Sequence, residues 1–199
     1  MPQITFSLRF AAAIALASAG AAMLPGPALA EEGTGPVVSA PAGSVRGQAE
    51  GDVLAFKGIP YAAPPVGELR WQPPQEAAAW DGVRDASDFG PACYQPTIPG
   101  AANEIYHEEL GPMSEDCLSL NVWAPKDAEN APVFVWIHGG ALVSGTSGFD
   151  MYDGARMAEQ GVIVVSINYR LGVLGFLAHP ELSAESPQGI SGNYGLMDQ

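Results

Sequence analysis

Two nearly continuous apolar runs, rich in residues that favour β-strands, lie in the second half of the chain. Residues 132–138 read PVFVWIH and residues 161–168 read GVIVVSIN. Such runs are typical of strands that are buried on both faces, as in sheets covered by helices. A third strand is expected at residues 118–123. Residues 153–160 suit a short helix that Gly161 ends.

The region before residue 60 contains shorter Val-containing segments separated by glycines. Strands are expected at residues 37–38, 44–46 and 53–59. Many prolines make residues 60–99 mostly irregular. Together with the later runs, these segments predict an α/β fold. In it, a small N-terminal antiparallel sheet leads into a mixed, mostly parallel central sheet.

The first thirty residues differ in kind from the remainder. Arg9 is the only charged residue among them, and an apolar stretch covers residues 10–24. Ala28 and Ala30 then form a small-x-small pattern before Glu31. This order predicts a secretory signal peptide cleaved near the Ala30–Glu31 bond, so we expect a secreted or periplasmic protein. An uncleaved anchor is the alternative, although a membrane span needs about 20 apolar residues.

The composition is that of a folded, acidic protein. Hydrophobic residues make up 47% of the chain and charged residues 15%, which excludes an acidic disordered chain. With 8 Lys and Arg against 22 Asp and Glu, the formal net charge is −14. Phosphate backbones repel such a surface, so nucleic-acid binding is not expected. Residues 31–199 contain no apolar stretch that could span a bilayer, and we expect them to belong to one domain.

The chain has two cysteines, Cys93 and Cys117. In an exported protein an even number of cysteines favours a disulfide. This bridge would close a loop of about 25 residues and contribute roughly 3 kcal/mol in the chain-entropy model. Two free buried thiols are the alternative. Cys and His are too few and too scattered to predict a metal site, and no cofactor is expected.

A glycine-rich turn, His138-Gly139-Gly140-Ala141, directly follows the first apolar run. Consecutive glycines leave main-chain N–H groups sterically open, and such groups can stabilise developing negative charge. In α/β-hydrolases a turn of this type supplies one side of the oxyanion hole. A phosphate-binding loop is a competing interpretation, but Thr146 stands where that motif needs lysine. A plain tight turn is the other alternative.

Four other side chains are candidates for catalytic roles. His138 could be a general base, but its place at the strand end favours a role in bracing the turn. Ser144, Ser147 and Ser191 could be nucleophiles, but none lies in a G-x-S-x-G motif, which the chain lacks. We therefore reject all three serines.

Five segments in order resemble the type-B carboxylesterase family, which includes bacterial para-nitrobenzyl-type esterases and cholinesterases. They are FKGIPYA followed by PPVG (56–67), EDCLSLNV (115–122), WIHGGA (136–141), NYR with GVLGFL (168–177) and GNYGLMDQ (192–199). The resemblance implies that the chain is the N-terminal portion of an α/β-hydrolase domain. It also implies hydrolysis of small-molecule esters.

The resemblance assigns roles within the turn. Gly140 and Ala141 would supply the oxyanion-hole N–H groups, while Gly139 shapes the turn. Leu142 stands where the family usually has an aromatic residue, which changes the adjacent pocket. Cys93 and Cys117 match the family's first disulfide.

The resemblance further implies two structural ion pairs for the acids of the EDCL segment. Glu115 would pair with Arg70, and Asp116 with Arg170. Buried acids at the start of an apolar strand need such partners.

In relatives, the G-x-S-x-G serine follows the GNYGLMDQ segment, and the acidic and His members of the triad come later still. The resemblance therefore implies that the full-length protein is a serine esterase with a Ser-His-Glu/Asp triad. The 199-residue chain, lacking the triad, is expected to be inactive alone. The alternative is a non-catalytic member of the family that serves in adhesion or binding.

Overall fold

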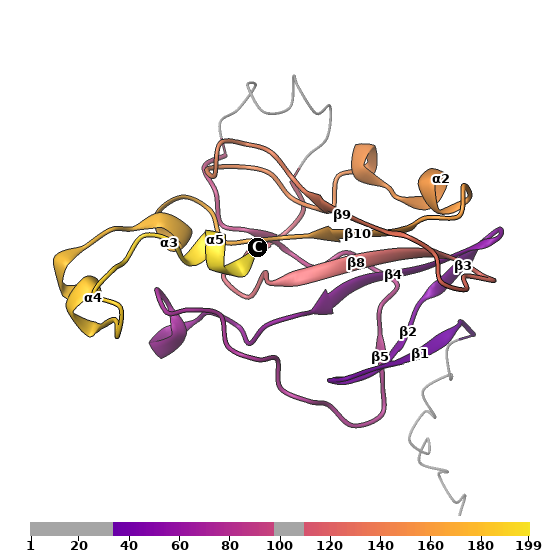
Figure 1. Ribbon diagram of the computed structural model, residues 1–199, viewed down its shortest axis with the longest axis horizontal. Helices are drawn as coiled ribbons and strands as arrows, with labels where there is room; N and C mark the ends of the chain where they lie inside the picture. The colour runs from indigo at the N-terminus through magenta and orange to yellow at the C-terminus, as the bar shows by residue number, and fades with distance from the viewer. Residues whose placement is uncertain (1–33, 98–109) are drawn as a thin grey trace, which may run out of the picture. The chain divides into compact units, whose positions relative to one another are not determined.

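The computed structural model describes residues 34–97 and 110–199, so the predicted signal peptide lies outside the described residues. Its largest sheet has five strands (Figure 1). β9 and β10 are parallel, and the other three pairings are antiparallel. In spatial order the strands are β3 (Gln48–Glu50), β4 (Val53–Pro60), β8 (Ser119–Pro125), β10 (Ile163–Ile167) and β9 (Val133–Ile137).

The connection from β9 to β10 carries the helix that covers one face of this sheet. It contains the 3₁₀ turn Asp150–Tyr152 and the helix α2 (Ala155–Ala158). Ala158 is buried against Trp123 of β8 and Val164 of β10. The predicted helix is thus present, shortened to one turn, and its apolar side closes this part of the core.

The other face of the sheet meets a smaller, three-stranded sheet. Its strands are β1 (Val37–Ala40), β2 (Gly43–Arg46) and β5 (Val83–Asp85), with β2 in the middle. The expected antiparallel pairing joins β1 to β2, while β5 adds in parallel. Val45 and Phe56 form a second buried cluster with Ala86, which joins the two sheets.

The expectation that residues 132–138 are buried on both faces is wrong for the described chain. Val133 and Val135 are 60% and 54% exposed. Among the described residues, β9 has β10 as its one neighbour and lies at the end of the strand order. β10 has a neighbour on each side and buries Val164, Ser166 and Ile167. Position in the sheet, rather than hydrophobicity, makes the difference.

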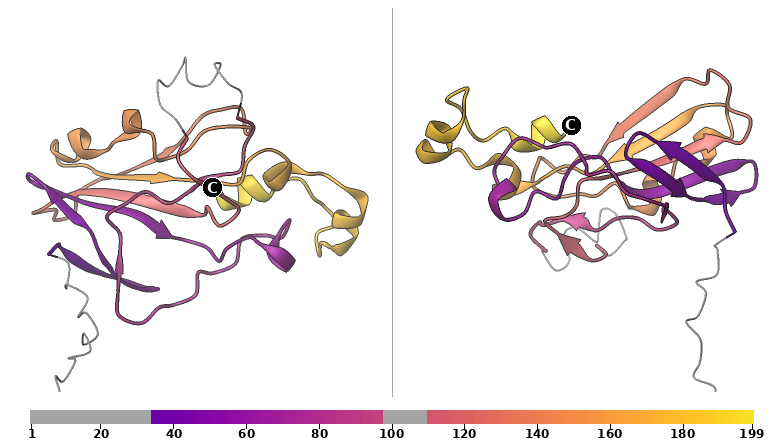
Figure 2. Two further views of the ribbon diagram at one scale, coloured as in Figure 1. Left: turned by 180° about the vertical axis from the view of Figure 1, so that it is seen from behind. Right: turned by 90° about the horizontal axis from the view of Figure 1, so that it is seen from below.

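Short elements that the sequence did not predict complete the fold (Figure 2). They are the 3₁₀ turn Gly67–Leu69, β6 (Ala92–Cys93), β7 (Met113–Ser114), α3 (Gly172–Phe176), α4 (Pro180–Glu185) and α5 (Tyr194–Asp198). Each is too brief for a helical or strand periodicity to show in the sequence.

None of the helices in the described residues is long and apolar enough to cross a membrane.

Candidate active site

The glycine-rich turn after β9 has an unusual backbone. Gly140, Ala141 and Leu142 have φ angles of 124°, 54° and 64°. Side chains rarely tolerate this region, and a Cβ on Gly140 would overlap the Ser144 carbonyl. The Gly140 carbonyl accepts the N–H groups of Val143 (3.0 Å) and Ser144 (3.1 Å). Left-handed φ angles at two consecutive residues with side chains, here Ala141 and Leu142, persist only where surrounding contacts stabilise them.

The main-chain N–H groups of Gly140 and Ala141 have no acceptor among the described residues. Ala141 is exposed and Gly140 is half-buried. Beside them lies an open apolar hollow of about 460 Å³, lined in part by Leu142, Val173 and Phe176. The turn therefore presents two free donors next to an apolar surface.

His138 lies beneath the turn and is buried. Its ring stacks on that of Tyr169, with centroids 4.6 Å apart, and the Tyr169 hydroxyl donates to the His138 carbonyl (3.0 Å). Nδ1 lies 2.9 Å from the Gly139 carbonyl oxygen, which only accepts, so Nδ1 is the donor. Burial lowers the pKa of the imidazole, against the opposing effect of this hydrogen bond. These contacts support the bracing role.

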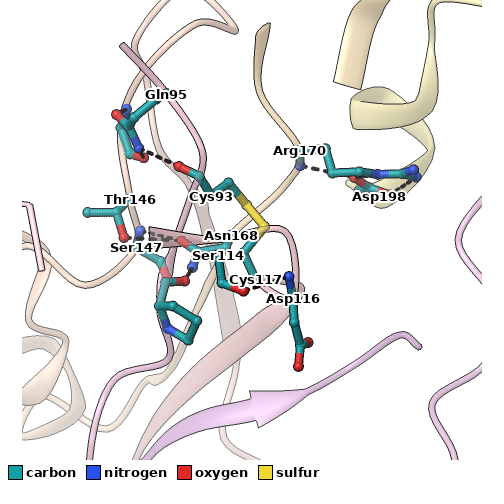
Figure 3. Close-up of a disulfide and its surroundings, with 12 residues drawn as sticks. Cys93, Gln95, Ser114, Asp116, Cys117, Thr146, Ser147, Asn168, Arg170 and Asp198 are labelled. Carbon is teal, nitrogen blue, oxygen red and sulfur yellow. Dashed lines mark hydrogen bonds and ion pairs between the residues drawn. A yellow bond between two sulfur atoms is a disulfide. The ribbon is translucent and has the colours of Figure 1, made fainter. Parts of the chain in front are cut away.

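A buried amide, which sequence reasoning missed, anchors the far end of the turn. Asn168 Oδ1 accepts the Ser147 N–H (2.8 Å) and the Thr146 hydroxyl (3.3 Å), as Figure 3 shows. Its Nδ2 donates to the Pro91 carbonyl (3.1 Å). Asn121 adds a bond from Nδ2 to Ser147 Oγ (3.1 Å). Because buried polar groups need partners, these bonds fix the segment in one conformation.

The rejected serines are not paired with a histidine ring in the described residues. Ser147 is buried in the network just described. Ser144 Oγ is 3.5 Å from the Gly140 carbonyl. Ser191 Oγ bonds to the main-chain carbonyl of His179 and to Ser183. None has the adjacent base that an activated serine requires.

The predicted disulfide between Cys93 and Cys117 is present. Their Cα atoms are 5.0 Å apart and both residues are buried (Figure 3). The bridge joins β6 to the residue pair that precedes β8. It therefore links β6 to the start of a central strand.

The expected ion pair between Arg70 and Glu115 is also present. Arg70 Nε donates to one carboxylate oxygen (2.6 Å) and Nη2 to the other (2.5 Å). The hydrogen bond from Arg70 lowers the pKa of the Glu115 carboxyl, and its charge adds to this effect. The acid is thus a structural anion rather than a proton carrier.

The expected pairing of Asp116 with Arg170 is wrong. Arg170 instead pairs with Asp198 of α5, through Nε to Oδ2 (2.8 Å) and Nη2 to Oδ1 (2.6 Å). Asp116 is exposed, and its N–H donates to Ser114 Oγ (3.0 Å) in a turn that directs the carboxylate away from Arg170 (Figure 3). A buried guanidinium needs a buried carboxylate, and α5 supplies it.

The sheet, the helical crossover and the glycine turn with free donors define a class, the α/β-hydrolases. A model of the carboxylesterase family matches residues 34–199, and the chain belongs to that family. It is 51% identical over 160 residues to the fumonisin B1 esterase of Sphingopyxis macrogoltabida. That match covers 78% of this chain and 28% of the relative.

Other relatives agree with this assignment. The chain is 45% identical over 165 residues to the para-nitrobenzyl esterase of Bacillus subtilis (strain 168), covering 82% of this chain and 32% of that protein. A solved structure of a PNB esterase superposes with a TM-score of 0.74 at 42% identity, over 83% of this chain and 33% of that one. The chain thus spans about a third of the length of these relatives, and its fold is that of the N-terminal part of an α/β-hydrolase.

Proposed function

We propose that the full-length protein containing this chain is a carboxylic-ester hydrolase that works through an acyl-enzyme. The observation that supports this most directly is the pair of unbonded N–H groups of Gly140 and Ala141 at the end of β9. Family membership and the esterases among the relatives support the same reaction. The substrate is a small-molecule ester, and no cofactor takes part.

In the proposed reaction, a serine from the part of the protein beyond Gln199 attacks the ester carbonyl carbon. A histidine takes the serine proton and passes it to the departing alcohol, leaving an acyl-serine that water then hydrolyses. The carbonyl oxygen becomes negative in each tetrahedral intermediate. Gly140 and Ala141 donate to that oxygen, and one such donor contributes about 3–4 kcal/mol to transition-state stabilisation.

The test uses the full-length protein with a p-nitrophenyl ester and with a fluorophosphonate that labels activated serines. We expect a burst of p-nitrophenol, steady turnover, and one phosphonate per chain by mass spectrometry. The 199-residue chain should show none of these. A full-length protein with Gly or Ala in place of the G-x-S-x-G serine, without label or turnover, would instead be the non-catalytic binding protein.

The export of the protein is part of the proposal. A signal peptide over residues 1–30 would direct the chain out of the cytoplasm, to the periplasm or the medium. The disulfide between Cys93 and Cys117 supports this, because disulfides persist in oxidising compartments.

A further inference from the structure

One side-chain amide, that of Gln95, is bonded to both main-chain groups of a residue in the active-site turn. Gln95 Nε2 donates to the Gly145 carbonyl (2.8 Å), and Gln95 Oε1 accepts the Gly145 N–H (2.7 Å). The two residues are 50 positions apart, and Gly145 is buried. An amide that satisfies both groups of one buried peptide residue fixes that residue in place.

Gly145 in turn packs directly against the part of the turn that carries the oxyanion donors. Its φ angle is 118°, and a Cβ there would overlap His138 Nδ1 and crowd the Gly139 carbonyl oxygen at 2.5 Å. Because Gly145 has no side chain, it lies close to the hydrogen bond between His138 Nδ1 and the Gly139 carbonyl without displacing it.

The Gly139 carbonyl and the Gly140 N–H belong to one peptide group. A peptide group is planar and trans, so its C=O and N–H point in opposite directions. When His138 holds the Gly139 carbonyl toward the interior, the Gly140 N–H points the other way, where it is unbonded. The orientation of this donor thus depends on a hydrogen bond against which the Gly145 backbone lies closely.

Gln95 is itself firmly anchored. Its Nε2 also donates to the Cys93 carbonyl (3.1 Å), a bond visible in Figure 3. Cys93 is bonded to Cys117, two residues before the first residue of β8. The amide is thereby connected to the central sheet through a covalent bridge.

We propose that Gln95 is a positioning residue for the oxyanion donors, an inference that rests on the proposed esterase function. It acts through Gly145, His138 and the Gly139 carbonyl, and it does not touch the substrate. Because the oxyanion contact strengthens in the transition state, loss of Gln95 should lower kcat and leave KM nearly unchanged.

The test compares full-length variants that alter the hydrogen bonds of the Gln95 side chain. Gln95→Met keeps the shape and removes both bonds to Gly145. Gln95→Glu keeps an acceptor for the Gly145 N–H but places a second oxygen against the Gly145 and Cys93 carbonyl oxygens, to which Nε2 now donates. Gln75→Met is the matched control, because the Gln75 side-chain amide is exposed and donates, within the described residues, to the neighbouring Pro73 carbonyl alone (3.0 Å).

Gln95→Met should reduce kcat about 10- to 100-fold, less than the loss of a whole donor, with KM within about threefold. Gln95→Glu should lose at least as much, because a carboxylate oxygen in place of Nε2 has no proton for the Gly145 and Cys93 carbonyls to accept. Binding of a trifluoromethyl ketone, which forms a tetrahedral adduct with an oxyanion, should weaken by the same factor as kcat/KM. Gln75→Met should match the wild type in all three measurements.

Wild-type turnover separates the two hypotheses. Absence of wild-type turnover would contradict the esterase proposal itself. A purely structural role for Gln95 would be shown by a different result. The wild type would turn over normally, and Gln95→Met would keep kcat within about twofold of it while its thermal midpoint falls. Should Gln95→Met fail to fold, the Gln95→Glu variant decides, because an unchanged kcat and ketone affinity there would overturn the positioning role.

Discussion

Arg170 and Asp198 form a doubly hydrogen-bonded ion pair in which the two side chains are only 4% and 0% exposed. The Arg170 N–H also donates to Asp198 Oδ2 (3.0 Å), and Nη1 donates to the Gln72 carbonyl (2.9 Å). The pair therefore connects the end of β10 to helix α5 and to the irregular segment before β5. It thereby links Gln72, which precedes the glycine-rich turn in the sequence, to Asp198, which follows it.

Removing the Asp198 carboxylate should strongly destabilise the full-length protein. Asp198→Asn leaves the Arg170 charge buried and unpaired, which costs about 3–5 kcal/mol. Asp116→Asn is the matched control and should change stability by less than about 0.5 kcal/mol, because Asp116 is exposed. Urea unfolding measures both, and a larger effect at Asp116 would reinstate its pairing with Arg170.

Gly140→Val should disable the oxyanion turn. The new side chain would overlap the Ser144 carbonyl at a residue with a φ angle of 124°. We expect kcat in the full-length protein to fall about 10²–10³-fold, as for the loss of one oxyanion donor.

Ala141→Gly is the comparison, since it keeps the N–H group and suits the φ angle of 54° better than alanine does. Its kcat should stay close to that of the wild type. Equal losses in the two variants would show that the side chain at residue 141, rather than the main-chain donors, matters for the reaction.

His138→Gln should lower activity without abolishing acylation. The imidazole is buried and its Nδ1 is committed to the Gly139 carbonyl, so it braces the turn. Stopped-flow measurement in the full-length variant should still show an acyl-enzyme burst. A folded variant without a burst would make His138 the general base.

The same histidine should contribute a pH dependence to stability. Burial lowers its folded-state pKa, so the unfolded chain binds the proton more readily. The stability that neutral His138 contributes is complete above about pH 6.5, the ordinary value, and is lost as pH falls through the lowered folded-state pKa. Thermal midpoints measured from pH 7.5 downward should fall less in His138→Gln than in the wild type.

The disulfide should persist in the exported protein and stabilise it. Thiol titration under denaturing, non-reducing conditions should detect neither Cys93 nor Cys117. Replacing both with alanine should cost about 3 kcal/mol, from the loop of about 25 residues that the bridge closes. Two free thiols in the untreated protein would contradict the bridge.

Export should remove the leader. N-terminal sequencing of protein from the medium or periplasm should begin at Glu31 or within a few residues of it. A mature protein that still carries residues 10–24 would identify an uncleaved anchor instead.

The sequence by itself predicted the features that depend on neighbouring residues. Apolar runs and glycine breaks located β4, β8, β9 and β10 to within a few residues, because strand formation follows local side-chain pattern. The two glycines after β9 indicated the turn, because its predicted function depends on main-chain N–H groups that consecutive glycines leave sterically open. The order of five motifs indicated the family and the pairing of Arg70 with Glu115.

Only the tertiary structure decided which distant groups meet. Asp198 rather than Asp116 pairs with Arg170, 28 residues away, and Gln95 reaches Gly145 across 50 residues. It also decided that β10 is enclosed between β8 and β9. A hydrogen bond or ion pair requires its two atoms to lie about 3 Å apart. For residues far apart in the sequence, the folding of the chain sets that distance, and the local pattern of side chains does not predict it.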